Sequence, residues 1–164
     1  MTILVKNKHT LLIDEFKFRC CIGKKSTTIN KKEGDKKTPK GIFDIENLYF
    51  RKDRIKKPQT SLTCIEIKES MGWCDDVNNA KKYNKLIKIN KKLKHEKLKR
   101  KDYKYDLLIP IKYNFKKPVV GKGSCIFIHL TKNYNPTAGC IALKEKDFLI
   151  LLRLIKKKTK IKIL

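Results

Sequence analysis

The chain has 164 residues, 40% of them hydrophobic, so it is long enough to bury a core, and no apolar run reaches the ~18 residues that a membrane helix requires. The formal net charge of +26 at pH 7 would suit an anionic partner such as nucleic acid, acidic lipid or an acidic polymer. Only five of the 42 basic residues are Arg, the residue on which nucleic-acid readers rely for bidentate contacts. We therefore interpret the lysine excess as compositional bias on a solvated surface and expect no nucleic-acid partner.

The N-terminal part predicts a meander of strands followed by a turn-rich loop. Short apolar and β-branched runs at 2–6, 10–14 and 16–22 are separated by polar breaks, as in neighbouring strands. The start of the chain lacks the basic-then-apolar layout of a secretory signal. Residues 34–41 (GDKKTPKG) form a loop with two glycines and a proline, which leads into a strand at 42–45.

The middle of the chain gives weaker signals. Alternation at 62–67 predicts a strand, and 106–113 (DLLIPIKY) predicts another whose Pro110 favours an edge or a bulge. Residues 71–76 (MGWCDD) hold the only Trp, a thiol and two carboxylates, and fit a packed Trp with exposed acids as well as a functional element. The Lys-rich stretch 78–104 has irregularly spaced apolar residues, which predicts loop and one short helix.

The C-terminal part predicts one helix and a closing strand. Residues 144–155 predict a helix with acids in the first turn and residues 156–158, all Lys, at its end, as the helix dipole prefers. The stretch is apolar nearly all round, so we expect the helix to pack across a sheet. Residues 159–164 (TKIKIL) alternate as a strand does. Because no linker divides the chain, we expect one domain over residues 1–164.

The chemistry concentrates in residues 124–143 (SCIFIHLTKNYNPTAGCIAL). An apolar strand ends at His129, a turn-rich loop follows, and Cys140 opens a second apolar run. A strand, a reversal and a second strand would make His129 and Cys140 neighbours, although they are eleven positions apart. A thiol beside an imidazole is sufficient for nucleophilic acyl chemistry. The alternative interpretation is structural: a buried Cys and a His whose hydrogen bonds are satisfied within the sheet.

A thiolate at Cys140 would need an activating neighbour, because a free thiol with a pKa near ~8.5 is mostly protonated at neutral pH. We expect an imidazolium at His129 to lower that pKa. Gly139 lets a substrate carbonyl approach, the backbone N–H of Cys140 with one nearby suits an oxyanion, and Thr137 can add a hydroxyl hydrogen bond. The other five cysteines lack metal-ligand or disulfide spacing, so we expect small buried hydrophobes and no metal site.

The residues 136–143 (PTAGCIAL) with His129 upstream resemble the active-site signature of the L,D-transpeptidase (YkuD-like) family, a His followed by Ser/Thr-x-Gly-Cys. Residues 34–43 (GDKKTPKGIF) resemble the upstream Gly-Asp-x-x-Thr-Pro-x-Gly-x-Phe element of the same family. The resemblance covers nearly the whole chain. Residues 72–76 (GWCDD), His95-Glu96 and 105–107 (YDL) look like elements of a compact single-domain branch.

The resemblance implies a mainly β (α+β) fold, a bent β-sandwich or barrel-like sheet with one packed C-terminal helix. It implies an acyltransferase of cell-wall biogenesis: Cys140 attacks a peptidoglycan stem peptide with His129 as base, and an amine of a second stem resolves the thioester. No cofactor is implied. We expect a monomer whose partners are donor and acceptor stem peptides, with loose association to anionic wall polymer or a membrane surface as a further option.

Two departures from the family pattern concern substrate binding. Many members carry Gly directly after the His and Arg two positions after the Cys, whereas this chain has Leu130 and Ala142. We therefore expect a substrate carboxylate to contact Arg51, Arg54 or lysines of the middle segment. From the branch-like elements, we expect Trp73, Asp75 and His95 to line the same cleft.

Two alternatives remain open from the sequence. The acyl-enzyme could be resolved by water, which would make the protein an L,D-carboxypeptidase, or the chain could be a non-catalytic basic module that binds peptidoglycan or nucleic acid. The resemblance implies the cell envelope or periplasm, whereas the absence of a visible signal taken literally points to the cytoplasm.

Overall fold

The computed structural model describes all 164 residues and is mostly β, with four sheets and one helix. The elements in chain order are β1 Thr2–Asn7, β2 Thr10–Ile13, β3 Phe16–Arg19, β4 Thr27–Thr28, β5 Thr38–Pro39, β6 Gly41–Asp44, β7 Leu48–Phe50, β8 Cys64–Glu66, β9 Met71–Cys74, β10 Leu86–Lys88, β11 His95–Lys97, β12 Leu107–Pro110, β13 Phe127–Leu130, β14 Ile141–Leu143, α1 Glu145–Leu154 and β15 Lys160–Ile163. The predicted β-rich α+β fold is confirmed, but the sheets do not close into a barrel.

The N-terminal sheet has the strand order β3-β2-β1-β15-β6, so the last strand of the chain pairs with the first. β1 and β15 run parallel, with Ile3 opposite Ile161. Along β15 the side chains alternate between exposed and buried, as expected when one face of a sheet covers a core and the other meets solvent. The predicted meander and closing strand are therefore both present.

The central sheet has the order β14-β13-β12-β7-β8, and four of its strands are buried along their whole length. Its two faces belong to different cores. Ile109, Ile128 and Ile141 point into a cluster of 25 buried residues shared with α1 and the N-terminal sheet. Phe127 and Cys140 point the other way, into a cluster of nine. Such burial on both faces explains why these strands are nearly continuous apolar runs in the sequence.

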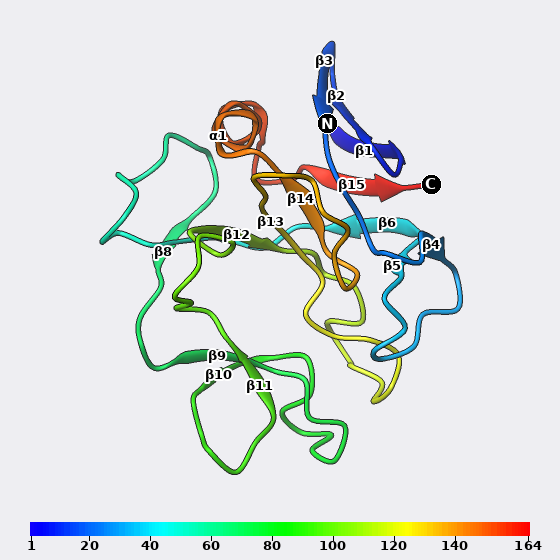
Figure 1. Ribbon diagram of the computed structural model, residues 1–164, viewed down its shortest axis with the longest axis vertical. Helices are drawn as coiled ribbons and strands as arrows, with labels where there is room; N and C mark the ends of the chain where they lie inside the picture. The colour runs from blue at the N-terminus through cyan, green and yellow to red at the C-terminus, as the bar shows by residue number, and fades with distance from the viewer.

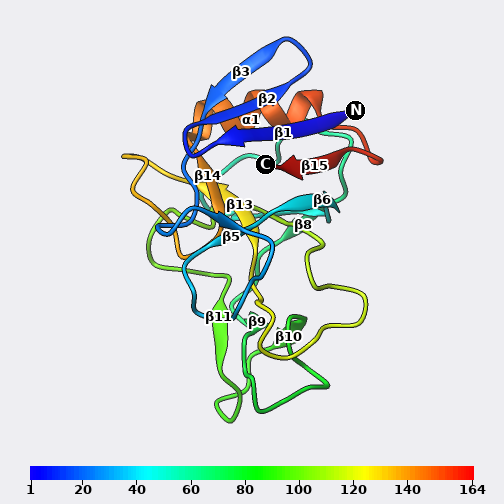
Figure 2. The ribbon, with the colours of Figure 1, turned by 90° about the vertical axis from the view of Figure 1, so that its right-hand side faces the viewer.

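The helix α1 lies beside the N-terminal sheet, at the end of the molecule opposite the small sheet β10-β9-β11 (Figures 1 and 2). Its buried residues Phe148, Leu151 and Leu152 lie at spacings of three and four, which form one face of a helix. Ile150 on another face is exposed, so the helix is amphipathic rather than apolar all round. It is too short and insufficiently apolar to span a membrane.

Two expectations for the middle of the chain are wrong. The Lys-rich stretch 78–104 forms no helix, but contains β10 and β11, which flank β9 on both sides. The short apolar pairs in this stretch have partners only across the sheet, a long-range arrangement that local periodicity does not reveal. Pro110 ends β12, which is a central strand, and not an edge strand.

Candidate active site

His129 lies in β13 and Cys140 directly precedes the adjacent strand β14, so their side chains lie on the same face of the central sheet. β13 and β14 are parallel, with Ile128 opposite Ile141 and His129 opposite Ala142. The sequence suggested a simple reversal, but the connection over residues 131–140 is long enough to return to the start of β13. Cys140 therefore lies beside Phe127, whose backbone N–H points at the Cys140 Sγ at 3.4 Å. The thiol is therefore level with Phe127, two residues before His129 in β13, and lies on the same face of the sheet.

Both side chains line one cavity of about 340 Å³. Cys140 is 8% exposed and His129 is 7% exposed, so each is mostly desolvated while bordering a space that a ligand can enter. No group of three or more His, Cys, Asp or Glu side chains is placed to hold a metal ion.

The imidazole of His129 is held in the tautomer of a general base. Its Nδ1 lies 2.9 Å from the carbonyl oxygen of Leu130, and because a carbonyl can only accept, Nδ1 carries the proton and Nε2 is free to take one. Burial lowers the pKa of His129 to about 4, against a smaller opposing effect of the Leu130 carbonyl. The ring packs edge to face with Tyr105 at 5.5 Å. At neutral pH His129 is thus an uncharged base.

The thiol of Cys140 is also uncharged in this structure. Its Sγ donates to the carbonyl oxygen of Cys125 at 3.1 Å. Burial raises the pKa of Cys140 to about 12, and the nearby negative charge of Glu96 acts in the same direction. The expected thiolate–imidazolium pair is therefore wrong as a resting state, because burial disfavours both charges. For His129 to remove the proton as the sulfur attacks, the S–H must turn from the Cys125 carbonyl toward Nε2.

The loop before Cys140 has an ordered backbone. The hydroxyl of Thr137 donates to the carbonyl oxygen of Cys140 at 2.5 Å and accepts the N–H of Gly139 at 3.1 Å. The N–H groups of Ala138 and Cys140 make no hydrogen bond within the chain, and both residues line the cavity. These two N–H groups are the donors that the site offers to an oxyanion.

Gly139 is required by its conformation and by its neighbour. Its φ of +143° lies in the region that residues with a Cβ rarely adopt. A Cβ at this position would lie 2.8 Å from the carbonyl oxygen of Lys37. The GDKKTPKG loop thus packs directly onto the residue before Cys140, which brings the two family-like sequence elements into one site.

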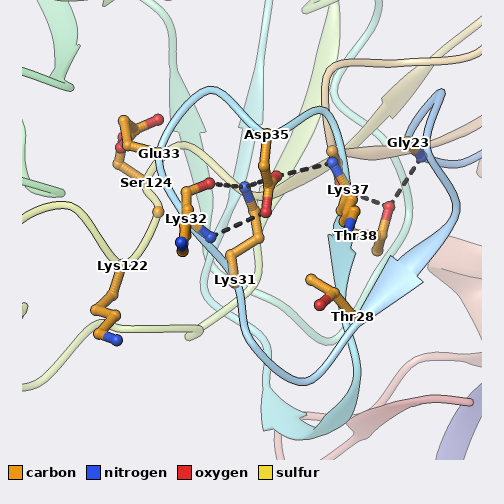
Figure 3. A network of polar contacts seen from close by, with 12 residues as sticks. Gly23, Thr28, Lys31, Lys32, Glu33, Asp35, Lys37, Thr38, Lys122 and Ser124 are labelled. Carbon is orange, nitrogen blue, oxygen red and sulfur yellow. Dashed lines mark hydrogen bonds and ion pairs between the residues drawn. The ribbon is translucent and has the colours of Figure 1, made fainter.

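Asp35 holds that loop in place (Figure 3). Its carboxylate accepts the backbone N–H groups of Lys32 at 2.9 Å and Lys37 at 2.8 Å, and the buried ammonium of Lys31 at 2.6 Å. Burial opposes ionisation of Asp35, but hydrogen bonds from Lys31, Lys32 and Lys37 outweigh it and lower the pKa. A charged Asp35 therefore stabilises the turn that presses Lys37 against Gly139.

The cavity is electrically mixed, although the chain as a whole is strongly basic. Its lining includes three carboxylates and three cations: Glu33, Asp75, Glu96, Lys31, Arg100 and Lys104. The carboxylate of Glu33 accepts the hydroxyl of Ser124 at 2.7 Å. Asp75 Oδ1 is buried without a hydrogen-bond partner, and its other oxygen lies 3.5 Å from the exposed Lys94 ammonium. Lys31 is paired with Asp35 and Arg100 with Asp102, so Lys104 and Asp75 are the cation and the carboxylate of the lining with the fewest internal partners.

Arg51 and Arg54, expected to bind a substrate carboxylate, do not line the cavity. The guanidinium of Arg51 is buried and pairs with Asp53 at 2.6 and 2.8 Å. Arg54 pairs with Asp106 at 3.0 Å. Both arginines follow β7 and also donate to backbone carbonyls of residues 100–102. Their guanidinium groups are therefore engaged in contacts within the fold. The sequence indicated basic residues in this region but not which of them face the cavity.

Of the three residues expected from the branch-like elements, only Asp75 lines the cavity. His95 is paired with Cys74 across β11 and β9, on the face opposite that of Glu96. Its Nδ1 hydrogen bonds with the Leu93 carbonyl at 2.7 Å. Trp73 is buried, and its indole N–H donates to Asn84 at 3.0 Å, as the packed-Trp interpretation proposed.

Sequence reasoning missed several residues that border the nucleophile. Glu96 accepts a hydrogen bond from the hydroxyl of Tyr105, whose pKa burial raises. Lys104 and Arg100 come from the loop before β12, and Lys104 forms no ion pair. The sequence did contain a clue to Glu96. Successive side chains of a strand point to opposite faces, so only one of His95 and Glu96 could face the site.

A family model described as YkuD, the L,D-transpeptidase catalytic domain, matches residues 1–163 of the chain. A comparison with curated proteins finds no match. Among solved structures, the chain is similar to one described as the structure of Bdellovibrio bacteriovorus Bd1075, with 16% identity and a TM-score of 0.48. That match covers 99% of this chain and 47% of the other, so the chain spans about half the length of that protein.

Proposed function

The chain belongs to the YkuD family of L,D-transpeptidase catalytic domains, and on that premise we propose that residues 1–164 form one catalytic domain that transfers acyl groups of peptidoglycan stem peptides through Cys140. The observation that carries the proposal is the shared cavity of Cys140 and His129, with an imidazole whose proton sits on Nδ1. Since the substrate class is that of the bacterial wall, we propose the cell envelope as its place of action.

In the acylation step, the Cys140 Sγ forms a bond to the carbonyl carbon of the diamino acid in the stem tetrapeptide. Nε2 of His129 takes the thiol proton, and the carbonyl oxygen becomes an oxyanion held by the N–H groups of Cys140 and Ala138. The C–N bond to the terminal D-Ala then breaks, and His129 returns the proton to the departing amine. The product is a thioester on Cys140.

In the second step, an amine attacks the thioester. Neutral His129 accepts the proton of the attacking amine and passes it to the departing sulfur, which restores the thiol and the uncharged imidazole. An amine from a second stem gives a cross-link, whereas water gives a shortened tripeptide. The same residues serve both outcomes, so the acceptor that reaches the cavity decides between transpeptidase and carboxypeptidase.

The charged lining of the cavity suggests how the donor is bound. Lys104 lines the cavity and lacks an ion-pair partner, so it is the candidate for a substrate carboxylate in place of Arg51 and Arg54. Arg100 also lines the cavity, but its guanidinium is paired with Asp102 at 2.6 and 2.9 Å. Asp75 and Glu96 are the candidates for a substrate ammonium, since Asp75 Oδ1 is buried with no donor near it. A stem peptide that contains a diamino acid carries both groups.

The direct test incubates the protein with disaccharide tetrapeptides and follows the products by mass spectrometry. Loss of D-Ala with a covalent thioester on Cys140 supports the proposal. Cys140→Ala should lack both products, and Cys64→Ala, which alters a cysteine outside the cavity, is the matched control. D-Ala release that persists in Cys140→Ala would refute the assignment of the nucleophile.

A further inference from the structure

Thr38 is a buried residue that touches the loop of the nucleophile without bordering the cavity. It lies in the short strand β5, next to the Asp35 turn and close to Gly23 (Figure 3). Its side chain is 0% exposed, so its hydroxyl can only hydrogen bond within the protein. The partners of that hydroxyl therefore determine what it does.

The hydroxyl of Thr38 joins two glycines that are far apart in the sequence. It accepts the backbone N–H of Gly23 at 2.9 Å and donates to the backbone carbonyl of Gly139 at 2.8 Å. A hydroxyl has one proton, and the Gly23 N–H is itself a donor, so that proton must go to Gly139. The direction of both hydrogen bonds is thus fixed by chemistry.

This contact sets the orientation of the peptide bond between Gly139 and Cys140. No peptide bond in the chain is cis, and in a trans peptide the carbonyl and the N–H point in opposite directions within one plane. The Gly139 carbonyl points to Thr38, inside the protein. The N–H of Cys140 therefore points away from Thr38, on the side of the cavity, where it has no partner within the chain.

We propose that Thr38 is a positioning residue for acyl transfer, which holds the Gly139–Cys140 peptide so that the Cys140 N–H faces the developing oxyanion. The inference rests on the proposed function of Cys140 and adds a residue that touches neither the substrate nor the thiol. A glycine can adopt a wider range of φ and ψ than other residues, so hydrogen bonds must select the orientation of the peptide at 139. Thr137 holds the Gly139 N–H, and Thr38 holds the Gly139 carbonyl.

The surrounding loop supports this role. The Lys37 carbonyl packs against Gly139, and the backbone N–H of Lys37 is held by Asp35 at 2.8 Å. Thr38 follows directly, so the Asp35 turn determines where its hydroxyl lies. On the other side, the Gly23 N–H keeps the hydroxyl oxygen in place. The Asp35 turn and the Gly23 N–H therefore both fix the position of the Thr38 hydroxyl.

The test compares acylation with alkylation of Cys140 in the Thr38→Val variant, which keeps the shape but removes the hydroxyl. Acylation by a nitrophenyl ester forms an oxyanion, whereas alkylation by iodoacetamide does not. Loss of a whole oxyanion donor costs about 10²–10³-fold in rate, so a misplaced donor should slow acylation about 10- to 100-fold. Alkylation should change less than about twofold, and Thr38→Ser should restore acylation.

Thr28→Val is the matched control, because Thr28 lies on the neighbouring strand β4 and its hydroxyl contacts only the Asn30 N–H, at 3.1 Å. Unchanged acylation in Thr38→Val, or equal losses of acylation and alkylation, would overturn the inference. The stem tetrapeptide is measured in parallel. If the wild type is acylated by the ester but not by the peptide, the proposed substrate is wrong, while the effect of Thr38 on ester acylation still decides its role.

Discussion

Replacing Gly139 with Ala tests whether the loop around Asp35 truly constrains the nucleophile. The new Cβ would lie 2.8 Å from the Lys37 carbonyl oxygen, which is a backbone atom and cannot swing aside. The backbone φ of +143° would add strain of about 1–3 kcal/mol, and the overpacking would add another 1–3 kcal/mol. We therefore expect the free energy of unfolding to fall by about 2–6 kcal/mol.

The assay is urea unfolding followed by circular dichroism, with acylation of Cys140 measured on the folded protein. Gly121→Ala is the control, because Gly121 also has a positive φ of +80° but has nothing within 4 Å of an added Cβ. It should lose only the backbone contribution, about 1–2 kcal/mol. If Gly139→Ala were as stable as Gly121→Ala and were acylated at the wild-type rate, the close approach of Lys37 would not constrain the site.

Three further predictions follow from the site. Burial lowers the pKa of His129 to about 4, so kcat/KM should fall only as the pH drops through about 4, where the imidazole becomes charged. A pH–rate profile whose acid limb lies near the ordinary pKa of histidine would contradict this. Trp73→Phe removes the indole hydrogen bond to Asn84, whose Oδ1 keeps the backbone N–H of Cys125 at 3.2 Å, so thermal or urea unfolding should show a loss of about 0.5–1.5 kcal/mol with kcat/KM unchanged. Lys104→Met should raise KM for the tetrapeptide about tenfold, equivalent to ~1.4 kcal/mol. Arg51→Gln should change stability but not KM, because Arg51 is paired with Asp53 outside the cavity. If steady-state kinetics showed the opposite pattern, Arg51 and not Lys104 would bind the substrate carboxylate.

Local patterns were sufficient for much of the secondary structure. The alternation at the N-terminus and at 159–164, and the helix over 144–155, correspond to observed elements within a few residues at each end. These elements are amphipathic, so one buried face repeats with a period that the sequence displays. The helix expected within 78–104 was wrong, because β10 and β11 are short and become strands only by pairing with β9.

For the candidate site, the sequence indicated Cys140, His129, Gly139 and Thr137, because turn residues and a thiol follow an apolar strand in a recognisable order. Taken alone, the loop around Asp35 indicated only a connection, and its link to the site was implied by the resemblance to the family. It did not reveal that this loop contacts Gly139 through Lys37 and Thr38, since Thr38 and Gly139 are 101 positions apart.

From its own residues, the sequence indicated the short strands, the C-terminal helix and the candidate pair Cys140 and His129, because these depend on local periodicity and on the chemistry of single side chains. The β-rich fold class and the acyl-transfer role of that pair were implied by the resemblance to the family. Only the tertiary structure decided that β13 and β14 are parallel, that Arg51, Arg54, Trp73 and His95 do not line the cavity, and that burial disfavours the charged forms of Cys140 and His129. The physical reason is that side-chain direction and desolvation depend on which distant strands pair and cover one another, and no short stretch of chain carries that information.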